Sequence, residues 1–247
     1  MRSLRKLASA GLLLLGGCSS TGVGNPAPVS LSLSIVDDTQ AQDAAQDLPK
    51  ASIQDALVVL GELGFQPCDV ALGTAYTAPG PFIVDLKAGT TSPDLPVIPG
   101  TPGGYCGIDA PLAPTKNAGL VGRSLFFDGY RADGTFFMVY ANMKGTLRLR
   151  ATPGANWLGL ETPPAFFWVF RPRRWIAKSE LDSADVTPDV THGQAIVIDA
   201  DRHTAWFLAI RARLAGLSTL YEDANGDGTF DDSDRLNIVG QGLSDAN

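Results

Sequence analysis

The segment Val29-Ser-Leu-Ser-Leu-Ser-Ile35 alternates apolar residues with serine over its whole length. Successive side chains of a β-strand point to opposite faces, so this period of two predicts a strand with one buried face. Further strands are expected in the short apolar runs downstream, at residues 81–86, 105–112, 146–150, 166–170 and 195–198. Glycine and proline, with 27 and 17 residues, lie between many of these runs and indicate turns. The pattern predicts a mainly β fold, an antiparallel β-sandwich.

Turn residues and glycines refine this assignment at two places. The segment Arg131-Ala-Asp-Gly134 separates two apolar runs, and Asp-Gly in that position is a strong hairpin signal. Residues 51–65 fit the spacing of either a helix or a strand. Because Gly61 and Gly64 weaken a helix, we expect a strand there.

One helix is expected late in the chain, at residues 201–214, where Asp201 can act as its cap. Its apolar stripe is formed by Trp206, Phe207, Ile210 and Leu214. The helix is expected to lead, through residues 218–221, into a loop that begins at Asp223. The strands before and after it suggest a β-rich half over residues 29–115 and a second half over residues 116–247, or else one domain made of both.

The first residues have the features of a secretory signal peptide. Three basic residues, Arg2, Arg5 and Lys6, precede an apolar run at residues 7–15, and Leu15-Gly-Gly-Cys18 follows. The apolar run is too short to span a bilayer as a helix, and no later run is long enough.

The order Leu-Gly-Gly-Cys resembles the bacterial lipobox. The resemblance implies that residues 1–17 are a signal peptide, that the Cys18 thiol is diacylated, and that the new amino end is acylated. Residues 18–28 would then be a lipidated tether. Ser19 directly follows the lipidated cysteine, and in lipoproteins of this kind a residue other than Asp at that position resembles the outer-membrane sorting signal. We expect a lipid-anchored protein of the bacterial outer membrane or cell surface. The alternative is an ordinary exported protein with an incidental cysteine.

The charge of the chain limits its partners. Removal of residues 1–17 would lower the basic residues from 19 to 16 against 26 acidic ones, which takes the formal charge from −7 to −10. An acidic protein repels nucleic acid and anionic lipid. We therefore expect attachment to the membrane through the lipid on Cys18, no nucleic-acid partner, and a glycan or envelope protein as a possible ligand.

Two cysteines remain after Cys18, namely Cys68 and Cys106. Export would place them in an oxidising compartment, so a disulfide between them is predicted. Two buried free thiols are the alternative. Neither cysteine has a second Cys or His at a spacing typical of a metal site.

Residues 223–234 read Asp-Ala-Asn-Gly-Asp-Gly-Thr-Phe-Asp-Asp-Ser-Asp. This order follows the twelve-position EF-hand pattern, in which oxygen ligands stand at positions 1, 3, 5, 7, 9 and 12 and glycine at position 6. The glycine is Gly228, and Phe230 is the apolar anchor at position 8. The candidate calcium ligands are Asp223, Asn225, Asp227, the backbone carbonyl of Thr229, Asp231 through water, and Asp234.

Position 12 departs from the pattern, because Asp234 stands where a bidentate Glu is usual. In this the segment resembles dockerin-type and other extracellular calcium loops, for which a dissociation constant of roughly 10⁻⁴–10⁻³ M is ordinary. The alternative is a solvated acidic turn. The related segment Asp133-Gly-Thr-Phe136 has Gly129 and Arg131 at ligand positions 1 and 3, so it predicts no second loop.

A further resemblance concerns the first half of the chain. Gly80-Pro-Phe-Ile-Val-Asp-Leu86 and Pro102-Gly-Gly-Tyr105 are similar to segments of uncharacterised bacterial lipoproteins with transthyretin-like or carbohydrate-binding-like β-sandwich domains. The resemblance implies a sandwich at the cell surface and no reaction. The sequence shows no nucleophile elbow, phosphate loop or dinucleotide pattern.

Two functions follow. The first is a calcium-stabilised binding or structural module without catalysis. The alternative is a calcium-dependent hydrolase that acts on envelope or extracellular glycans and uses a pair of carboxylates. One basic-aromatic cluster could contact an acidic glycan or lipid head group, or balance acidic residues within the protein; it comprises Arg171, Arg173, Arg174 and Trp175.

Overall fold

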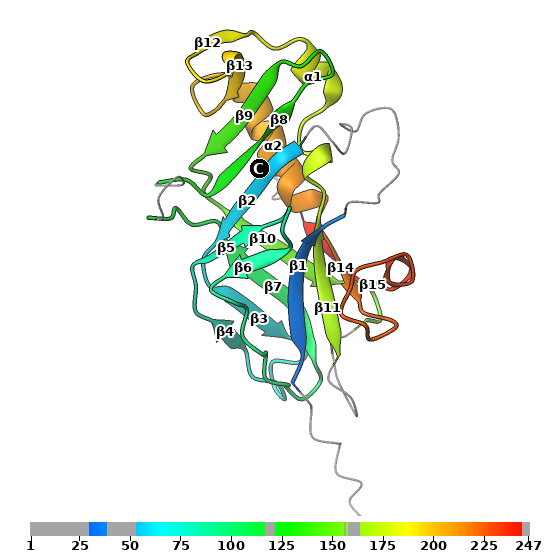
Figure 1. Ribbon diagram of the computed structural model, residues 1–247. Coiled ribbons are helices and arrows are strands. Elements are labelled where there is room, and N and C mark those ends of the chain that lie inside the picture. The colour runs from blue at the N-terminus through cyan, green and yellow to red at the C-terminus, as the bar shows by residue number, and fades with distance from the viewer. Residues whose placement is uncertain (1–29, 39–52, 117–121, 156, 158–163, 244–247) are drawn as a thin grey trace, which may run out of the picture.

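Two β-sheets face each other in the computed structural model, which describes residues 30–38, 53–116, 122–155, 157 and 164–243 (Figure 1). The larger sheet has the strand order β1 (Ser32–Asp37), β11 (Ala165–Phe170), β14 (Thr219–Glu222), β15 (Ile238–Leu243), β10 (Thr146–Ala151), β7 (Tyr105–Pro111), β3 (Leu63–Pro67) and β4 (Tyr76–Ala78). The second has the order β12 (Thr187–Asp189), β13 (Gly193–Ile198), β9 (Phe136–Ala141), β8 (Leu125–Tyr130), β2 (Ile53–Leu60), β5 (Phe82–Asp85) and β6 (Thr90–Ser92). The predicted mainly β sandwich is confirmed.

The alternation in the first strand gives the expected burial. Leu31, Leu33 and Ile35 are buried, whereas the serines between them are exposed. The partner of β1 is β11, which runs parallel to it, with Leu33 opposite Phe166. Strands β9 and β13 are parallel as well. Most of the other pairings are antiparallel, so the sandwich differs from the purely antiparallel prediction at these two places. A parallel pair needs a long connection and leaves no local turn signal in the sequence.

The two refined strand assignments are confirmed. Strands β8 and β9 form an antiparallel hairpin, and Gly134 adopts a positive φ of 85° in its turn. Residues 51–65 supply β2 and β3 rather than a helix, with a break at Gly61. Gly80 packs so closely on Gly61 that a Cβ atom there would lie 2.1 Å from the Gly61 carbonyl oxygen.

The late helix differs from its prediction at both ends. Helix α2 spans Thr204–Gly216 and follows His203, which has a left-handed φ of 57°, so Asp201 is not its cap. The Asp199 carboxylate instead accepts hydrogen bonds from the backbone of Asp201 and Arg202. Strand β14 separates α2 from the loop that begins at Asp223.

The predicted halves of the chain interleave. Strand β7 of residues 29–115 pairs with β10 of residues 116–247, and β2 pairs with β8 in the same way. One hydrophobic cluster includes buried side chains from both sheets. Trp175, which the sequence placed in a basic-aromatic cluster, is fully buried in it and packs edge-on against Phe127. Both sheets and the core therefore draw on both halves.

Cys68 and Cys106 form the predicted disulfide, with their Cα atoms 4.8 Å apart. Cys68 follows the end of β3 and Cys106 lies in the first part of β7. These strands are already paired, so the disulfide closes one end of the larger sheet. No helix in the described part of the chain has both the length and the apolar character needed to cross a bilayer.

A partly buried ion pair joins the helices α1 (Lys178–Asp182) and α2. The short helix α1 carries Glu180, whose carboxylate accepts hydrogen bonds from Arg213 of α2 at 2.6 and 2.9 Å and from the Ala177 backbone at 2.7 Å. Partial burial acts to raise the pKa of Glu180, but these hydrogen bonds outweigh it, so the pKa lies below its ordinary value of 4.5.

This lowered pKa predicts a pH-dependent contribution to stability. A carboxyl group with a lower pKa in the folded state stabilises the fold above its unfolded pKa and loses that effect as the pH falls through the folded pKa. The urea midpoint of the wild type should therefore exceed that of Glu180→Gln at pH 7, and the gap should narrow below pH 4.5. Lys178→Gln, which alters an exposed pair with Asp182, serves as a control. A gap that stays constant down to pH 3 would contradict the assignment.

Candidate functional site

The loop at residues 223–234 leaves the end of β14 and runs into a 3₁₀ turn at Asp234–Leu236, beside the larger sheet (Figure 1). Its first residue is fixed by the sheet, because the Asp223 backbone N–H donates to the Ala165 carbonyl oxygen at 2.9 Å. Strand β15 follows and pairs with β14. The loop is thus the connection of a two-stranded hairpin, held at both ends by regular structure.

Two glycines give the loop its sharp turns. Gly226 and Gly228 have φ values of 72° and 74°, in the region that favours glycine. Gly228 occupies position 6, as predicted. The Asp223 carboxylate accepts hydrogen bonds from both glycine N–H groups, at 2.7 and 2.9 Å. Position 1 therefore faces the turn that the glycines form.

Three of the predicted ligand side chains converge inside this turn. The amide nitrogen of Asn225 lies 3.0 Å from Asp227 Oδ2 and 3.3 Å from Asp231 Oδ2. Asp227 is further held by the Thr229 N–H, which donates to its Oδ1 at 2.7 Å. The side chain and backbone of Ser233 donate to Asp231 and hold the pKa of that carboxyl group below its usual range.

The carboxylate of Asp234, at position 12, links two parts of the loop from within the protein. Asp234 is fully buried. Its Oδ1 accepts from the Ala224 N–H and its Oδ2 from the Asp231 N–H, each at 2.9 Å. One carboxylate therefore ties together the first and last parts of the loop. A shorter Asp fits this inward position, where the pattern usually has Glu.

The donor set has the chemistry of a calcium site, since the converging side chains offer carboxylate and amide oxygens, the ligands that this hard cation prefers. The side chains are farther apart than the ligands of a bound metal ion. Within the described ranges, no three His, Cys, Asp or Glu residues lie close enough together to hold a metal ion. Asn225 now places its amide nitrogen, rather than its oxygen, toward the two carboxylates. An Asn side chain can turn its oxygen inward.

The apolar anchor packs the loop onto the sheet. The Phe230 ring lies 5.6 Å from the Phe167 ring and 5.1 Å from the Tyr221 ring, between centroids. These residues stand on β11 and β14, on the face of the larger sheet turned away from the main core. Arg235 stacks on the ring of Phe230, with 4.8 Å between its guanidinium carbon and the ring centroid.

A buried ion-pair network that the sequence did not reveal adjoins the loop. Asp38 is 2 % exposed, and Arg235, in the 3₁₀ turn that follows the loop, lies 2.7 Å from its carboxylate. Arg171, from the end of β11, lies 3.4 Å from the same carboxylate. Asp38 follows directly on β1 and carries its charge into the interior. Arg171 and Arg235 compensate the burial of this charge, and residues 39–52 lie outside the described part.

Two arginines of the basic-aromatic cluster, Arg171 and Arg173, make contacts within the fold. Arg171 also donates to the Tyr221 hydroxyl at 2.8 Å, to Thr219 and to the Leu217 carbonyl oxygen. Arg173 donates to the Asp38 carbonyl oxygen at 2.9 Å. Balance of an acidic residue within the protein, one of the two interpretations of this cluster, is seen for Arg171, which pairs with Asp38.

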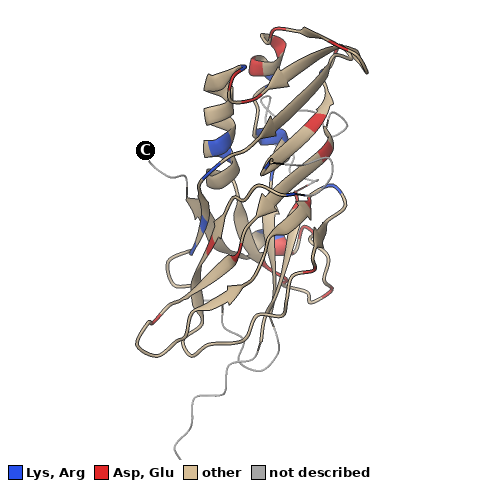
Figure 2. Cartoon of the chain, turned by 90° about the vertical axis from the view of Figure 1, so that its left-hand side faces the viewer, with Lys and Arg blue, Asp and Glu red and all other residues tan. Residues whose placement is uncertain are grey.

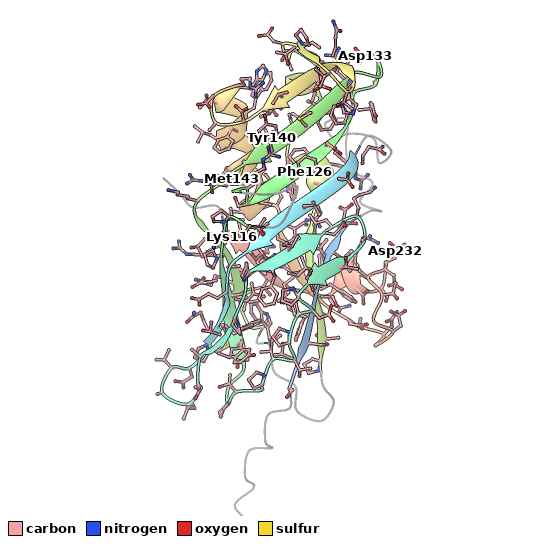
Figure 3. All side chains as sticks on the ribbon, turned by 60° about the vertical axis from the view of Figure 1, so that its left-hand side comes forward. Lys116, Phe126, Asp133, Tyr140, Met143 and Asp232 are labelled. Atoms are coloured by element: carbon pink, nitrogen blue, oxygen red, sulfur yellow. A yellow bond between two sulfur atoms is a disulfide. The ribbon has the colours of Figure 1, made fainter. Side chains whose placement is uncertain are left out.

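The second Asp-Gly-Thr-Phe segment lies elsewhere. Figure 3 shows Asp133 at the tip of the β8–β9 hairpin and Asp232 on the loop beside the larger sheet, well apart. Asp133 pairs with Arg131 and accepts from the Thr135 N–H, as in an ordinary hairpin turn. Cys18 and the rest of the predicted tether, residues 18–28, lie outside the described residues.

A small cavity lies between α2 and the start of β10, with a volume of about 90 Å³. It is lined by Leu112, Lys144, Gly145, Thr146, Leu147, Leu208, Arg211, Ala212 and Ala215. Its charged residues are both basic, so this cavity does not offer the carboxylate pair expected of a glycan hydrolase. No family model matches the chain, and no curated protein or solved structure matches it either.

Proposed function

We propose that this chain is a lipid-anchored envelope protein whose β-sandwich is stabilised by calcium in the loop at residues 223–234, and that it acts as a binding or structural module without catalysis. The observation that carries the calcium proposal is the convergence of Asn225, Asp227 and Asp231 inside the turn made by Gly228. A glycan or an envelope protein is the proposed class of ligand.

Each loop residue would have a defined task. Asp223, Asn225 and Asp227 would bind the cation directly, Thr229 through its backbone carbonyl and Asp231 through water. Asp234 already links the first and last parts of the loop, so its carboxylate would lie near the cation as the ligand at position 12. Bound calcium would supply positive charge that offsets the repulsion between these carboxylates. Because Phe230 fixes the loop to β11 and β14, the binding energy would stabilise the larger sheet.

Calcium is expected to raise the stability of the soluble form that begins after Cys18. A ligand that binds only the native state stabilises it by RT ln(1 + [L]/Kd), about 2.7 kcal/mol at a hundredfold excess over Kd. With a Kd of roughly 10⁻⁴–10⁻³ M, 10 mM calcium should therefore add about 1.4–2.7 kcal/mol. The measurement is the thermal midpoint at increasing calcium, with magnesium as a parallel series.

Two variants of one loop separate binding from general charge effects. Asp227→Ser removes a proposed ligand and should abolish the rise. Asp232→Ser removes the same charge at position 10, which is not a ligand position and is 87 % exposed, and should leave the rise intact. A wild-type midpoint that does not change up to 10 mM calcium would show that the loop is a solvated turn.

The anchor is tested separately. The mass of the protein isolated from bacterial membranes should correspond to a chain that begins at Cys18 and carries acyl chains, and Cys18→Ser should move the protein out of the membrane fraction. The anchor rests on the sequence Leu15-Gly-Gly-Cys18. More than one acyl chain is needed for stable attachment. A wild-type protein without acyl chains would refute this part of the proposal while leaving the calcium part untouched.

A further inference from the structure

Three large apolar side chains are exposed at one end of the sandwich. Val70 and Leu72, in the loop at residues 68–75, are 85 % and 66 % exposed, and Val97, in the loop at residues 93–104, is 68 % exposed. Single exposed apolar residues are normal, but a group of them at one end of a soluble domain marks an interaction surface.

The two loops form one rigid unit. The disulfide joins Cys68 to Cys106, and the Cys68 N–H donates to the Gly104 carbonyl oxygen at 2.9 Å. Farther along, the Thr74 N–H donates to the Thr101 hydroxyl oxygen at 2.7 Å. The exposed apolar side chains therefore stand on two loops that are bonded to each other and, through the disulfide, to β7.

This end also differs from the rest of the protein in charge. Neither loop contains Lys or Arg, and each contains one acidic residue, Asp69 or Asp94. The Asp69 carboxylate accepts a hydrogen bond from the Ala71 N–H at 2.8 Å. In Figure 2 the lower end is drawn mostly in tan, whereas charged residues gather higher up. A surface with few charged residues and exposed apolar side chains fits a lipid interface better than the rest of the acidic protein does.

The tether enters the fold at the same end. Leu31, at the start of the described chain, exchanges backbone hydrogen bonds of 2.8 and 2.9 Å with Ile98, the neighbour of Val97. Residues 19–29 separate Ser30 from Cys18, a length that spans at most about 40 Å when fully extended. A lipid on Cys18 would therefore keep this end near the bilayer, at a high effective concentration.

We propose that the loops at residues 68–75 and 93–104 form a membrane-facing surface, and that Val70, Leu72 and Val97 enter the interface of the bilayer that holds the lipid on Cys18. This inference rests on the proposed lipid anchor. It adds an orientation: the tether end of the sandwich faces the membrane, and the β12–β13 turn at the opposite end points away from it (Figure 1).

The test uses the acylated protein in phosphatidylcholine vesicles whose acyl chains carry bromine, which quenches tryptophan fluorescence at short range. Leu72→Trp and Val97→Trp place a probe on the proposed surface. Val190→Trp is the matched control, because Val190 is fully exposed in the β12–β13 turn. The wild type gives the background of its four tryptophans. The added tryptophans at 72 and 97 should be quenched at least about twofold more than the one at 190.

The outcomes separate the surface from the anchor. Equal quenching at 72, 97 and 190 in protein that floats with the vesicles would overturn the proposed surface and leave the anchor standing. Wild-type protein that carries no acyl chain and does not float would overturn the anchor, and the membrane-facing surface with it. All three substituted positions are exposed, so the variants are expected to fold as the wild type does.

Discussion

Asp38→Asn is expected to lower the free energy of unfolding by about 3–5 kcal/mol, the usual effect of removing one partner from a buried ion pair. The variant leaves Arg171 and Arg235 without their shared carboxylate, in a place where Asp38 is 2 % exposed. Asp38 follows β1, Arg171 follows β11, and Arg235 lies in the 3₁₀ turn before β15. The loss should be large because three separate segments lose their common contact. Urea unfolding at pH 7 measures it.

Asp232→Asn is the matched control for this prediction. Asp232 also pairs with Arg235, but it is 87 % exposed, and exposed pairs contribute less than about 1 kcal/mol. If the two variants lose the same stability, the network around Asp38 contributes no more than a surface pair, and its proposed role in the fold is wrong.

Loss of the disulfide is expected to cost about 4 kcal/mol. Cys68 and Cys106 are 38 positions apart, and the chain-entropy estimate for a closed loop of that length gives this value. The double variant Cys68→Ser, Cys106→Ser should therefore unfold at lower urea than the wild type in non-reducing buffer. The same protein pair should differ little in a reducing buffer that opens the wild-type bond. An unchanged midpoint in the double variant would contradict the prediction.

Much of the strand structure could be predicted because its signals are local. Alternation in Val29-Ser-Leu-Ser-Leu-Ser-Ile35 reports burial directly, since a strand repeats every two residues. The Asp-Gly at 133–134 specifies a hairpin through backbone angles that glycine adopts easily. The glycines of the loop at residues 223–234 specify its turns for the same reason. In each case the residues that determine the structure are neighbours in the chain.

The contacts that could not be predicted join distant segments. Asp38 and Arg235 are 197 positions apart, and nothing near Asp38 in the sequence indicates that it is buried. No turn motif in the sequence indicates the parallel pairing of β1 with β11. Asp201 has the right residue type for a helix cap, but the Asp199 carboxylate already holds its backbone in a turn, and α2 begins three residues later. The first two contacts join distant segments, which local propensity does not report, and at Asp201 a competing local turn displaces the expected cap.

The parallel pairing of β1 with β11 also determines how the protein would respond to force. β1 is the strand that the proposed tether would enter, and all six of its residues are in register with β11. A load that the proposed tether transmits along the axis of β1 would run across the direction of the ladder hydrogen bonds. These bonds are then strained together in shear, rather than opened one at a time as at the end of a hairpin. At the far end of the strand, the ion pairs of Asp38 resist the same displacement. The strand nearest the proposed anchor is thus attached in a geometry in which a pull along its axis loads all of its ladder bonds at once.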